Sequence, residues 1–236
     1  MRAAIEKRTS KRSFTTQKLT ADQISKIENM VTQINEKSGL TFEFIEDGSA
    51  GFTNFKKSYG FFKNVRSMIL TKGNINLPHL KEKIGYYGEE IMLDLVDMGY
   101  GTCWVGGTLD RDAFMINEDE DLACVILVGY AESRSLKNKL TASRTRIIRK
   151  PISERIISDC ELPEWLENGM QAVVLAPTAR NSQKVHFDYK DEVLTASVAD
   201  DYIRDLVDLG IAKKHFEIEA GGHFEWGNGA KYFRVD

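Results

Sequence analysis

Long apolar runs are missing from this chain of 236 residues. The longest, Leu122–Val128 and Ala172–Ala176, are far shorter than the roughly 20 residues that a membrane-spanning helix needs. No apolar stretch of signal-peptide length follows the basic N-terminus, Met1–Arg12. We therefore expect a cytoplasmic location and no association with a membrane.

Cysteine and basic charge are also scarce. The three cysteines, Cys103, Cys124 and Cys160, are widely spaced and form no CxxC motif, which argues against a disulfide framework and against a metal site. The 35 aspartates and glutamates outnumber the 32 lysines and arginines, for a net charge of −3. A nucleic-acid-binding protein usually carries a basic excess, so we expect no nucleic acid as a partner.

The apolar pattern alternates between helix and strand periods, which is typical of an α+β or α/β chain. One apolar face predicts a long helix over Lys81–Met98, and the nearly all-apolar Leu122–Gly129 predicts a strand buried on both faces. The pattern predicts further helices over Ala3–Lys7, Thr20–Lys37 (with Thr20 and Gln23 as a capping box), Thr108–Asn117, Pro163–Leu175 and Asp201–Phe216. It predicts further strands over Thr41–Glu46, Val65–Thr71, Val185–Tyr189, Val193–Ser197 (the last two as a hairpin) and Tyr232–Val235.

A weak internal repeat divides the chain. In the first half, Leu19 is followed by a helix and the strand Thr41–Glu46. In the second half, Leu162 is followed in a similar pattern by a helix and the segment Lys184–Tyr189. Each half of the chain would therefore open with a helix followed by a strand.

Two basic segments have the composition of a phosphate site. Arg8–Phe14 combines two arginines four residues apart with a serine hydroxyl, which suits bidentate, charge-assisted bonds to phosphate oxygens. Arg144–Lys150, with Arg144, Arg146 and Arg149, is a second source of positive charge. For either segment alone, a solvated basic surface is the simpler interpretation.

Two glycine-rich or amide-rich loops have the composition of a ligand site. Ala176–Gln183 joins a proline and small residues to two side-chain amides, which suit the edge of a heterocycle or a ribityl chain. Gly99–Gly107 places a tryptophan before a glycine pair, so a planar ring could approach the backbone closely. An ordinary turn explains much of each loop, but it leaves the pair Gly106-Gly107 unexplained.

Taken in order, these segments resemble the nitroreductase family of FMN enzymes over most of the chain. The motifs that carry the resemblance are Arg8–Phe14 (R-x-S-x-[RK]-x-F), Gly85–Gly107 (a long helix and G-x-G-T-x-W-[VI]-G-G), Leu127–Tyr130, Arg149–Ile152 (R-x-P-[LI]) and Ala176–Gln183 (A-P-[ST]-x-x-N-x-Q). The resemblance implies a nitroreductase-like α+β fold, with a central mixed or antiparallel sheet flanked by helices.

The order of the motifs departs from that of most of the family. The A-P-[ST]-x-x-N-x-Q loop usually follows the first long helix, near Ser38-Gly39, whereas here it lies in the C-terminal half. The family usually forms homodimers in which each FMN contacts both subunits. The order here resembles the thermophile-type subfamily, which implies two fused pseudo-symmetric halves, residues 1–156 and 157–236, forming one compact unit. We therefore expect one FMN per chain and a monomer that could function by itself.

The resemblance also implies roles for individual residues. Arg8, Ser10, Arg12 and Arg149 would hold the FMN phosphate. Pro177, Thr178, Ala179 and Asn181 would reach the flavin from the second half, while Trp104, Val105, Gly106 and Gly107 would line its ring. The Gly106 N–H would point at the flavin N5 atom. No side chain is expected to act as an acid or base, because the hydride chemistry belongs to the cofactor.

The implied activity is hydride transfer from NAD(P)H through FMN to a small acceptor such as a nitroaromatic, a quinone or a flavin, in a ping-pong cycle. Another flavin reaction on this fold, a flavin-binding sensor without turnover, and a basic-patch interaction protein stay open as alternatives. Lys184-Val185 stand where the family often has Pro-Trp, so we expect a differently shaped pocket. Asp47–Tyr59, with Phe52, Phe55 and Tyr59, is either a lid or a plain surface connection.

Overall fold

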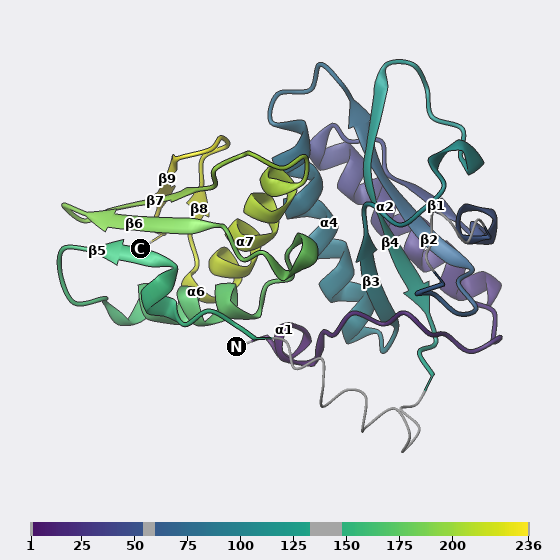
Figure 1. The fold of residues 1–236 in the computed structure, drawn as a ribbon, viewed down its shortest axis with the longest axis horizontal. Coiled ribbons are helices and arrows are strands. Elements are labelled where there is room, and N and C mark those ends of the chain that lie inside the picture. Colours follow the sequence, from purple (N-terminus) through teal and green to yellow (C-terminus); the bar gives the residue numbers. More distant parts are fainter. Residues whose placement is uncertain (1, 54–59, 133–147, 236) are drawn as a thin grey trace.

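The computed structural model describes residues 2–53, 60–132 and 148–235. Its α-helices are α1 (Ala3–Lys7), α2 (Ala21–Ser38), α4 (Leu80–Asp97), α6 (Glu164–Leu175) and α7 (Asp205–Ala220). Its strands are β1 (Glu43–Ile45), β2 (Ser67–Asn74), β3 (Gly101–Val105), β4 (Glu120–Gly129), β5 (Ile156–Ser158), β6 (His186–Lys190), β7 (Val193–Ser197), β8 (His223–Phe224) and β9 (Ala230–Phe233). Figure 1 shows two lobes, with α4 and α7 side by side between them.

The first lobe is built on an antiparallel sheet with the strand order β1-β2-β4-β3. Successive side chains of β4 enter two different cores: Ile126 faces the helices, whereas Val125 and Leu127 face the opposite side of the sheet. Both faces of β4 are therefore buried, which accounts for its nearly continuous apolar sequence and confirms the predicted central strand.

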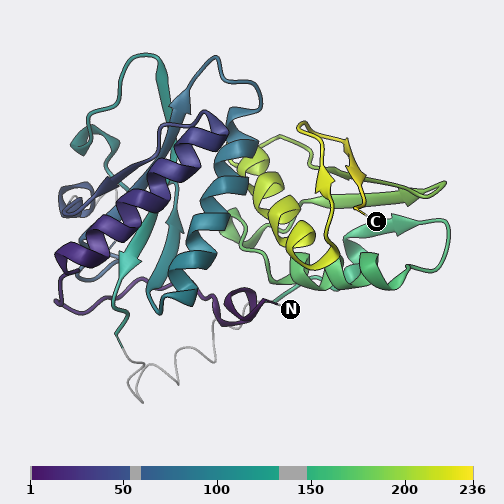
Figure 2. The same ribbon diagram turned by 180° about the vertical axis from the view of Figure 1, so that it is seen from behind.

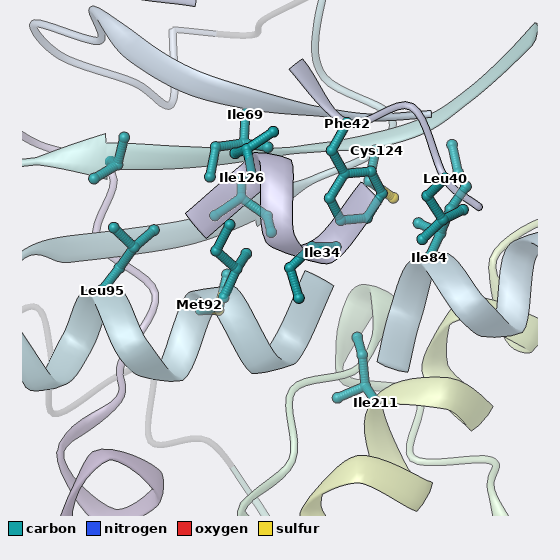
Figure 3. Close-up of a cluster of buried hydrophobic side chains, with 14 of the residues drawn as sticks. Ile34, Leu40, Phe42, Ile69, Ile84, Met92, Leu95, Cys124, Ile126 and Ile211 are labelled. Carbon is teal, nitrogen blue, oxygen red and sulfur yellow. The ribbon is translucent and has the colours of Figure 1, made fainter. Parts of the chain in front are cut away.

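Helices α2 and α4 cover one face of this sheet (Figure 2). α2 begins at the predicted capping box, since Gln23 N donates to Thr20 Oγ1 and Thr20 N donates to Gln23 Oε1. Figure 3 shows the core between the two helices and the sheet, where side chains of all three meet, among them Ile34, Ile84, Met92, Ile69 and Ile126.

The second lobe contains a mixed sheet with the order β5-β6-β7-β9-β8, in which β5 is parallel to β6 and the other pairs are antiparallel. The predicted hairpin is confirmed as β6 and β7. Helices α6 and α7 pack on this sheet through an aromatic core, in which the Phe187 and Phe216 rings stack with centroids 5.6 Å apart. β5 starts at Ile156, the last residue of the predicted first half, and pairs with this second sheet.

The two lobes meet where α4 crosses α7, and glycine makes that crossing close. A Cβ atom on Gly85 would overlap the carbonyl oxygen of Val207, and one on Gly210 would overlap that of Glu82. Glycine inside a helix costs about 1 kcal/mol relative to alanine, so its use at both positions indicates that backbone approach matters more here than helix propensity. The two contacts are reciprocal. In each helix the glycine lies three residues after the carbonyl that meets the other helix, so Glu82 precedes Gly85 as Val207 precedes Gly210.

The predicted α+β class is confirmed, with antiparallel and mixed pairing divided between two sheets. Three predictions of local structure were wrong. Gly101–Val105 is a strand, not part of a turn; Thr108–Asn117 contains only a short 3-10 turn at Arg111–Ala113; and α7 begins at Asp205 and continues to Ala220. α7 is buried on nearly every side by the two lobes, so its sequence has no single apolar face to mark its ends.

No helix in the described parts of the chain has both the length and the apolar composition needed to cross a bilayer.

Replacing Gly210 by alanine tests the crossing. We expect Gly210→Ala to lower the free energy of unfolding by about 1–3 kcal/mol or more, because the overlap with the backbone of α4 outweighs the gain in helix propensity. Gly107→Ala is the matched control, since a Cβ there meets no atom within 4 Å. Chemical denaturation measures both, and equal stability of the two variants would contradict the close crossing.

Candidate functional site

Helix α1 places Arg8 at the seam between the lobes. Ala4 and Ile5 are buried against Leu93 of α4 and Ala172 of α6, so α1 is wedged between two helices from different lobes. Arg8 follows directly, and its N–H donates to Ala4 O at 2.8 Å. The Arg8 side chain is only 5% exposed, and its Nε atom has no hydrogen-bond partner.

A second arginine lies close to Arg8. Arg149 donates to the Val174 carbonyl through Nη1 at 2.6 Å, at the end of α6. Burial and the positive charge of Arg8 lower the pKa of Arg149. Two positive guanidinium groups near one another favour a bound anion, so Arg8, which is buried, and Arg149, which is partly exposed, form a candidate anion site.

Ser10 and Arg12 line the edge of β3. Ser10 forms an isolated bridge with Thr102, and Lys11 N donates to Thr102 O at 2.8 Å. Burial raises the pKa of the Cys103 thiol, while the Arg12 charge and a hydrogen bond with Ser10 oppose that rise, which places both side chains beside Cys103. Arg12 itself is exposed.

The predicted ring-lining residues lie at the end of β3. The Trp104 indole packs against Gly88 of α4, where a Cβ would overlap it, and its Nε1 donates to Glu89 Oε2 at 2.8 Å. Val105 points to the other side of the sheet and is buried there, so its side chain cannot line the same site as Trp104. Gly106 is partly buried and Gly107 is exposed.

Two guanidinium groups converge on Gly106. Arg111 Nη2 donates to the Gly106 carbonyl at 3.1 Å, and Arg204 Nη2 donates to the same oxygen. The Arg204 side chain lies so close that a Cβ on residue 106 would overlap its Nε atom, so a larger residue there would require Arg204 to move. Arg204 precedes α7, so it joins the end of β3 to the second lobe.

The loop after α6 is held in an unusual conformation. Arg180, Asn181 and Gln183 all have positive φ, at 56°, 55° and 52°. Such angles are uncommon outside glycine and cost free energy, and they persist only where surrounding contacts fix them. Thr178 Oγ1 accepts from Gln183 N at 3.1 Å, and Pro177, Thr178 and Ala179 are each partly exposed.

Asp208 of α7 anchors this loop. Its carboxylate accepts from the Ala179 N–H at 3.0 and 2.9 Å. Burial, with a smaller contribution from Asp205, raises the pKa of Asp208 to about 7, although that hydrogen bond and the nearby Lys184 and Arg204 favour the charged form.

Gln183 and Asn181 connect the loop to the segment that carries Arg149. The Gln183 side chain donates to Ile148 O at 2.8 Å and accepts from Lys150 N at 2.8 Å, and Asn181 Nδ2 donates to Ile148 O at 3.1 Å. The amides expected to meet a heterocycle are therefore engaged with the protein backbone, and Gln183 is buried.

The described contacts bring most of the predicted site residues into one region. Arg8, Arg149, Trp104, Gly106 and the loop from Pro177 to Asn181 are linked in a continuous series through Glu89, Arg204, Asp208 and Ile148. Val105 contributes only its backbone.

Sequence reasoning missed Glu89, Arg204 and Asp208, which link the predicted residues, and assigned no role to His215, which contacts Glu89. The available signal was an acidic residue flanked by apolar ones, as at Asp208 between Val207 and Leu209, whereas Glu89 stands beside a second glutamate, Glu90, and is less easily singled out. A buried charge of that kind must be paired.

Several residues named in other predictions are not among the described ones. Arg144, Arg146, Phe55 and Tyr59 lie outside the described residues. Phe52, from the segment considered as a lid, packs its ring against Phe62 with centroids 4.9 Å apart.

Two cavities in the described chain lie outside the cluster of predicted site residues, although the first includes Phe14 of the Arg8–Phe14 motif and Asp47 and Ser49 of the Asp47–Tyr59 segment. One, of about 210 Å³, is lined by Phe14, Thr15, Thr16, Gln17, Leu19, Asp47, Ser49, Asn64, Val65, Arg66, Ser67, Val128, Gly129 and Tyr130. The other, of about 170 Å³, is lined by Tyr86, Tyr87, Lys213, Glu217, His223, Phe224 and Trp226. Neither includes a predicted site residue, and the described residues contain no cluster of histidine, cysteine and carboxylates fit to hold a metal.

Comparison with known proteins supports the fold. Residues 1–220 match the family model described as "Putative TM nitroreductase". A solved structure of a "putative nitroreductase" from Thermotoga maritima is 24% identical with a TM-score of 0.63, over 97% of this chain and 90% of that one. This likeness extends over nearly the whole chain, and together with the family model it confirms the predicted nitroreductase-like fold.

More distant solved structures match only part of the chain. An FMN-dependent nitroreductase from Clostridium difficile is 18% identical with a TM-score of 0.48, over 57% of this chain and 90% of that one. A "putative NADH oxidase" from Clostridium acetobutylicum is 21% identical with a TM-score of 0.46, over 56% of this chain and 89% of that one. No curated protein sequence matches the chain.

The buried carboxyl of Asp208 predicts a pH-dependent stability. Its pKa in the folded chain, about 7, exceeds the ordinary value of 3.8. Between these two values the unfolded carboxyl is ionised while the folded one keeps its proton, so its contribution to stability falls as pH rises from about 4 to about 7.

Asp208→Asn removes this titration while retaining an oxygen to accept from Ala179. We expect the variant to gain stability relative to the parent chain over that pH range, by at most about 1.4 kcal/mol per pH unit, with a constant difference above pH 8. Denaturation of both proteins from pH 4 to 9 measures the difference, and a difference independent of pH would contradict the assignment.

Proposed function

We propose, because the chain belongs to the family described as "Putative TM nitroreductase", that it is a flavin-dependent oxidoreductase that binds one FMN at the seam between its lobes. The observation that carries this proposal is the buried guanidinium of Arg8, whose Nε atom has no hydrogen-bond partner, near the partly exposed Arg149. Glu89 Oε1, at 3.9 Å, is too far away to accept a hydrogen bond from that Nε atom, and FMN would supply an acceptor in its phosphate.

The phosphate would be held by residues of both lobes. Arg8 and Arg149 offer guanidinium groups for bidentate contacts, and Ser10 and Arg12 lie at the adjacent edge of β3. Because Arg8 is fixed by α1 and Arg149 by the end of α6, the two arginines are already positioned before binding. Such preorganisation lowers the entropic cost of binding.

The flavin ring and ribityl chain would lie between the end of β3 and the loop after α6. Trp104, Gly106 and Gly107 come from the first lobe, while Pro177, Thr178, Ala179 and Asn181 come from the second. Asn181 would contribute mainly through its backbone, since its amide nitrogen donates to Ile148. A site completed by one chain would let a monomer function.

The protein's part in the chemistry would be to position backbone donors. The Gly106 carbonyl and the Gly107 N–H belong to one peptide plane and point in opposite directions. The two guanidinium groups that hold the carbonyl therefore also orient the Gly107 N–H, next to the Gly106 N–H expected at flavin N5. When bound, FMN would supply the hydride-accepting and hydride-donating chemistry.

NAD(P)H is the proposed electron donor, and a small nitroaromatic, quinone or flavin is the proposed acceptor. Donor and acceptor would use one open face of the site in turn, which implies ping-pong kinetics. A cytoplasmic location remains part of the proposal, as does the absence of membrane and nucleic-acid partners. A flavin sensor would share the FMN site but not the turnover.

An anaerobic absorbance experiment tests the activity. We expect purified protein reconstituted with FMN to lose its flavin absorbance on addition of NADH or NADPH and to regain it on addition of a nitroaromatic or a quinone. Flavin that is bound but not bleached by either nicotinamide would favour the sensor. Failure to bind FMN at all would contradict the proposal.

A substitution at Arg8 tests the phosphate site. We expect Arg8→Gln to weaken FMN binding by about tenfold or more, because a charge-assisted contact is lost. Riboflavin, which lacks the phosphate, should bind the variant and the parent chain about equally. Arg234→Gln is the control, since Arg234 lies exposed over Trp165 in the second lobe. Quenching of flavin fluorescence gives all the affinities, and equal loss of FMN and riboflavin binding would contradict the assigned role.

A further inference from the structure

A buried ion-pair network lies behind the proposed phosphate site. Glu89 of α4 and His215 of α7 are both 0% exposed, and His215 Nε2 lies 2.9 Å from Glu89 Oε1. The other carboxylate oxygen accepts from Trp104 Nε1. Arg8 Nε is 3.9 Å from Glu89 Oε1, which is too long for a hydrogen bond. Glu89 thus contacts Trp104, a proposed neighbour of the flavin ring, and His215 of the second lobe, and it also lies beside Arg8.

The hydrogen bonds of His215 determine how many protons this pair holds. His215 Nδ1 lies 3.0 Å from the Ala172 carbonyl, which can only accept, so Nδ1 carries a hydrogen. Nε2 faces a carboxyl oxygen at 2.9 Å, and two lone pairs would repel at that distance. A further proton therefore lies between His215 and Glu89. Whichever group holds it, the pair has no net charge.

The neutrality of the pair matters for Arg8. A lone carboxylate beside a buried guanidinium would form a salt bridge with it and occupy its donors. Here the Glu89 charge is already satisfied by His215 and Trp104, and Arg8 Nε has no partner. The Glu89–His215 pair as a whole therefore adds no net negative charge beside Arg8 and Arg149.

We propose that His215 is a positioning residue for FMN: it neutralises Glu89 from the second lobe, so that Arg8 and Arg149 stay available to a phosphate dianion. This inference rests on the proposed function, and it adds a residue that contacts neither the phosphate nor the ring. Phosphate affinity then depends on α7 being docked on α4, since His215 reaches Glu89 only across that crossing.

The crossing carries a related pair that is built differently. Counted from the glycine of its own helix, Gly85 in α4 or Gly210 in α7, Glu89 holds the same position as Lys214. By the same count, Glu90 holds the same position as His215. Glu90 and Lys214 form a salt bridge of 2.6 Å and are partly exposed, at 21% and 15% of their side chains. The pair beside Arg8 is fully buried and uses histidine, which binds the carboxyl without the long flexible stem of lysine.

Three variants separate this role from a purely structural one: Glu89→Gln, His215→Gln and the double variant. In Glu89→Gln the amide oxygen can accept from Trp104 and the amide nitrogen can donate to His215 Nε2, so every hydrogen bond and the zero net charge are retained. In His215→Gln, Glu89 keeps its charge but loses the partner that neutralises it, and Arg8 becomes its nearest cation.

The measured quantities are the dissociation constants of FMN and of riboflavin for each full-length variant. We expect Glu89→Gln to bind FMN within about threefold of the parent chain, because its charge is unchanged. We expect His215→Gln to weaken FMN binding by about tenfold or more while riboflavin binding changes little. The double variant should recover FMN affinity, since it no longer carries the competing carboxylate.

Other outcomes overturn the inference. Tighter FMN binding by about tenfold in Glu89→Gln would mean that Glu89 opposes the phosphate in the parent chain. Equal weakening of FMN and riboflavin in His215→Gln, or no recovery in the double variant, would indicate a structural role alone. If His215→Gln does not fold, Glu89→Gln still tests the neutrality of the pair, because FMN binding tighter by about tenfold would contradict it. A parent chain that binds neither flavin contradicts the proposed function, which is a separate failure.

Discussion

The close crossing of α4 and α7 is the constraint on which the rest of the structure depends. Gly85 and Gly210 let the two helix backbones touch, each against a carbonyl of the other helix. With that spacing, side chains such as Glu89 and His215 reach across at hydrogen-bonding distance. A larger separation would leave these polar groups buried and unpaired, at a cost of several kcal/mol. Helix packing and polar pairing therefore stabilise the same interface.

The crossing also assembles the candidate site from parts that are far apart in the sequence. It brings Arg204 and Asp208 of the second lobe to Gly106 and to the loop after α6, and α1 packs against both α4 and α6 (Figure 1). Arg8 follows α1 and so lies at the junction of both lobes. The site is thus a property of the interface, which is the reason that neither lobe alone contains it.

The sequence predicted the elements well where one periodic signal governs each of them. The capping box at Thr20, the helix over 81–98 and the apolar strand β4 follow from local chemistry, and the motif order pointed to a nitroreductase-like fold. Local chemistry failed where tertiary contacts decide. β3 reads as a glycine-rich turn but is held as a strand by pairing with β4, and α7 has no apolar face because two lobes bury it.

The site was predicted in the same uneven way. Arg8, Trp104 and Gly106 are recognisable in the sequence because they belong to a motif. Glu89, Asp208 and His215 belong to none, and their importance comes from partners 15 or more residues away in the chain, so only the folded structure reveals them. Asn181 and Gln183 had the right chemistry for a ligand, but the backbone around Ile148 already uses their amides.

The central claim is that one chain completes one FMN site. Native mass spectrometry of the FMN-loaded protein at decreasing concentration tests it most directly, because mass reports subunits and bound flavin together. We expect a monomer that retains one FMN after any dimer has dissociated. Loss of FMN whenever the protein becomes monomeric, or two FMN molecules bound only to a dimer, would show that the site needs a second chain and would contradict the account.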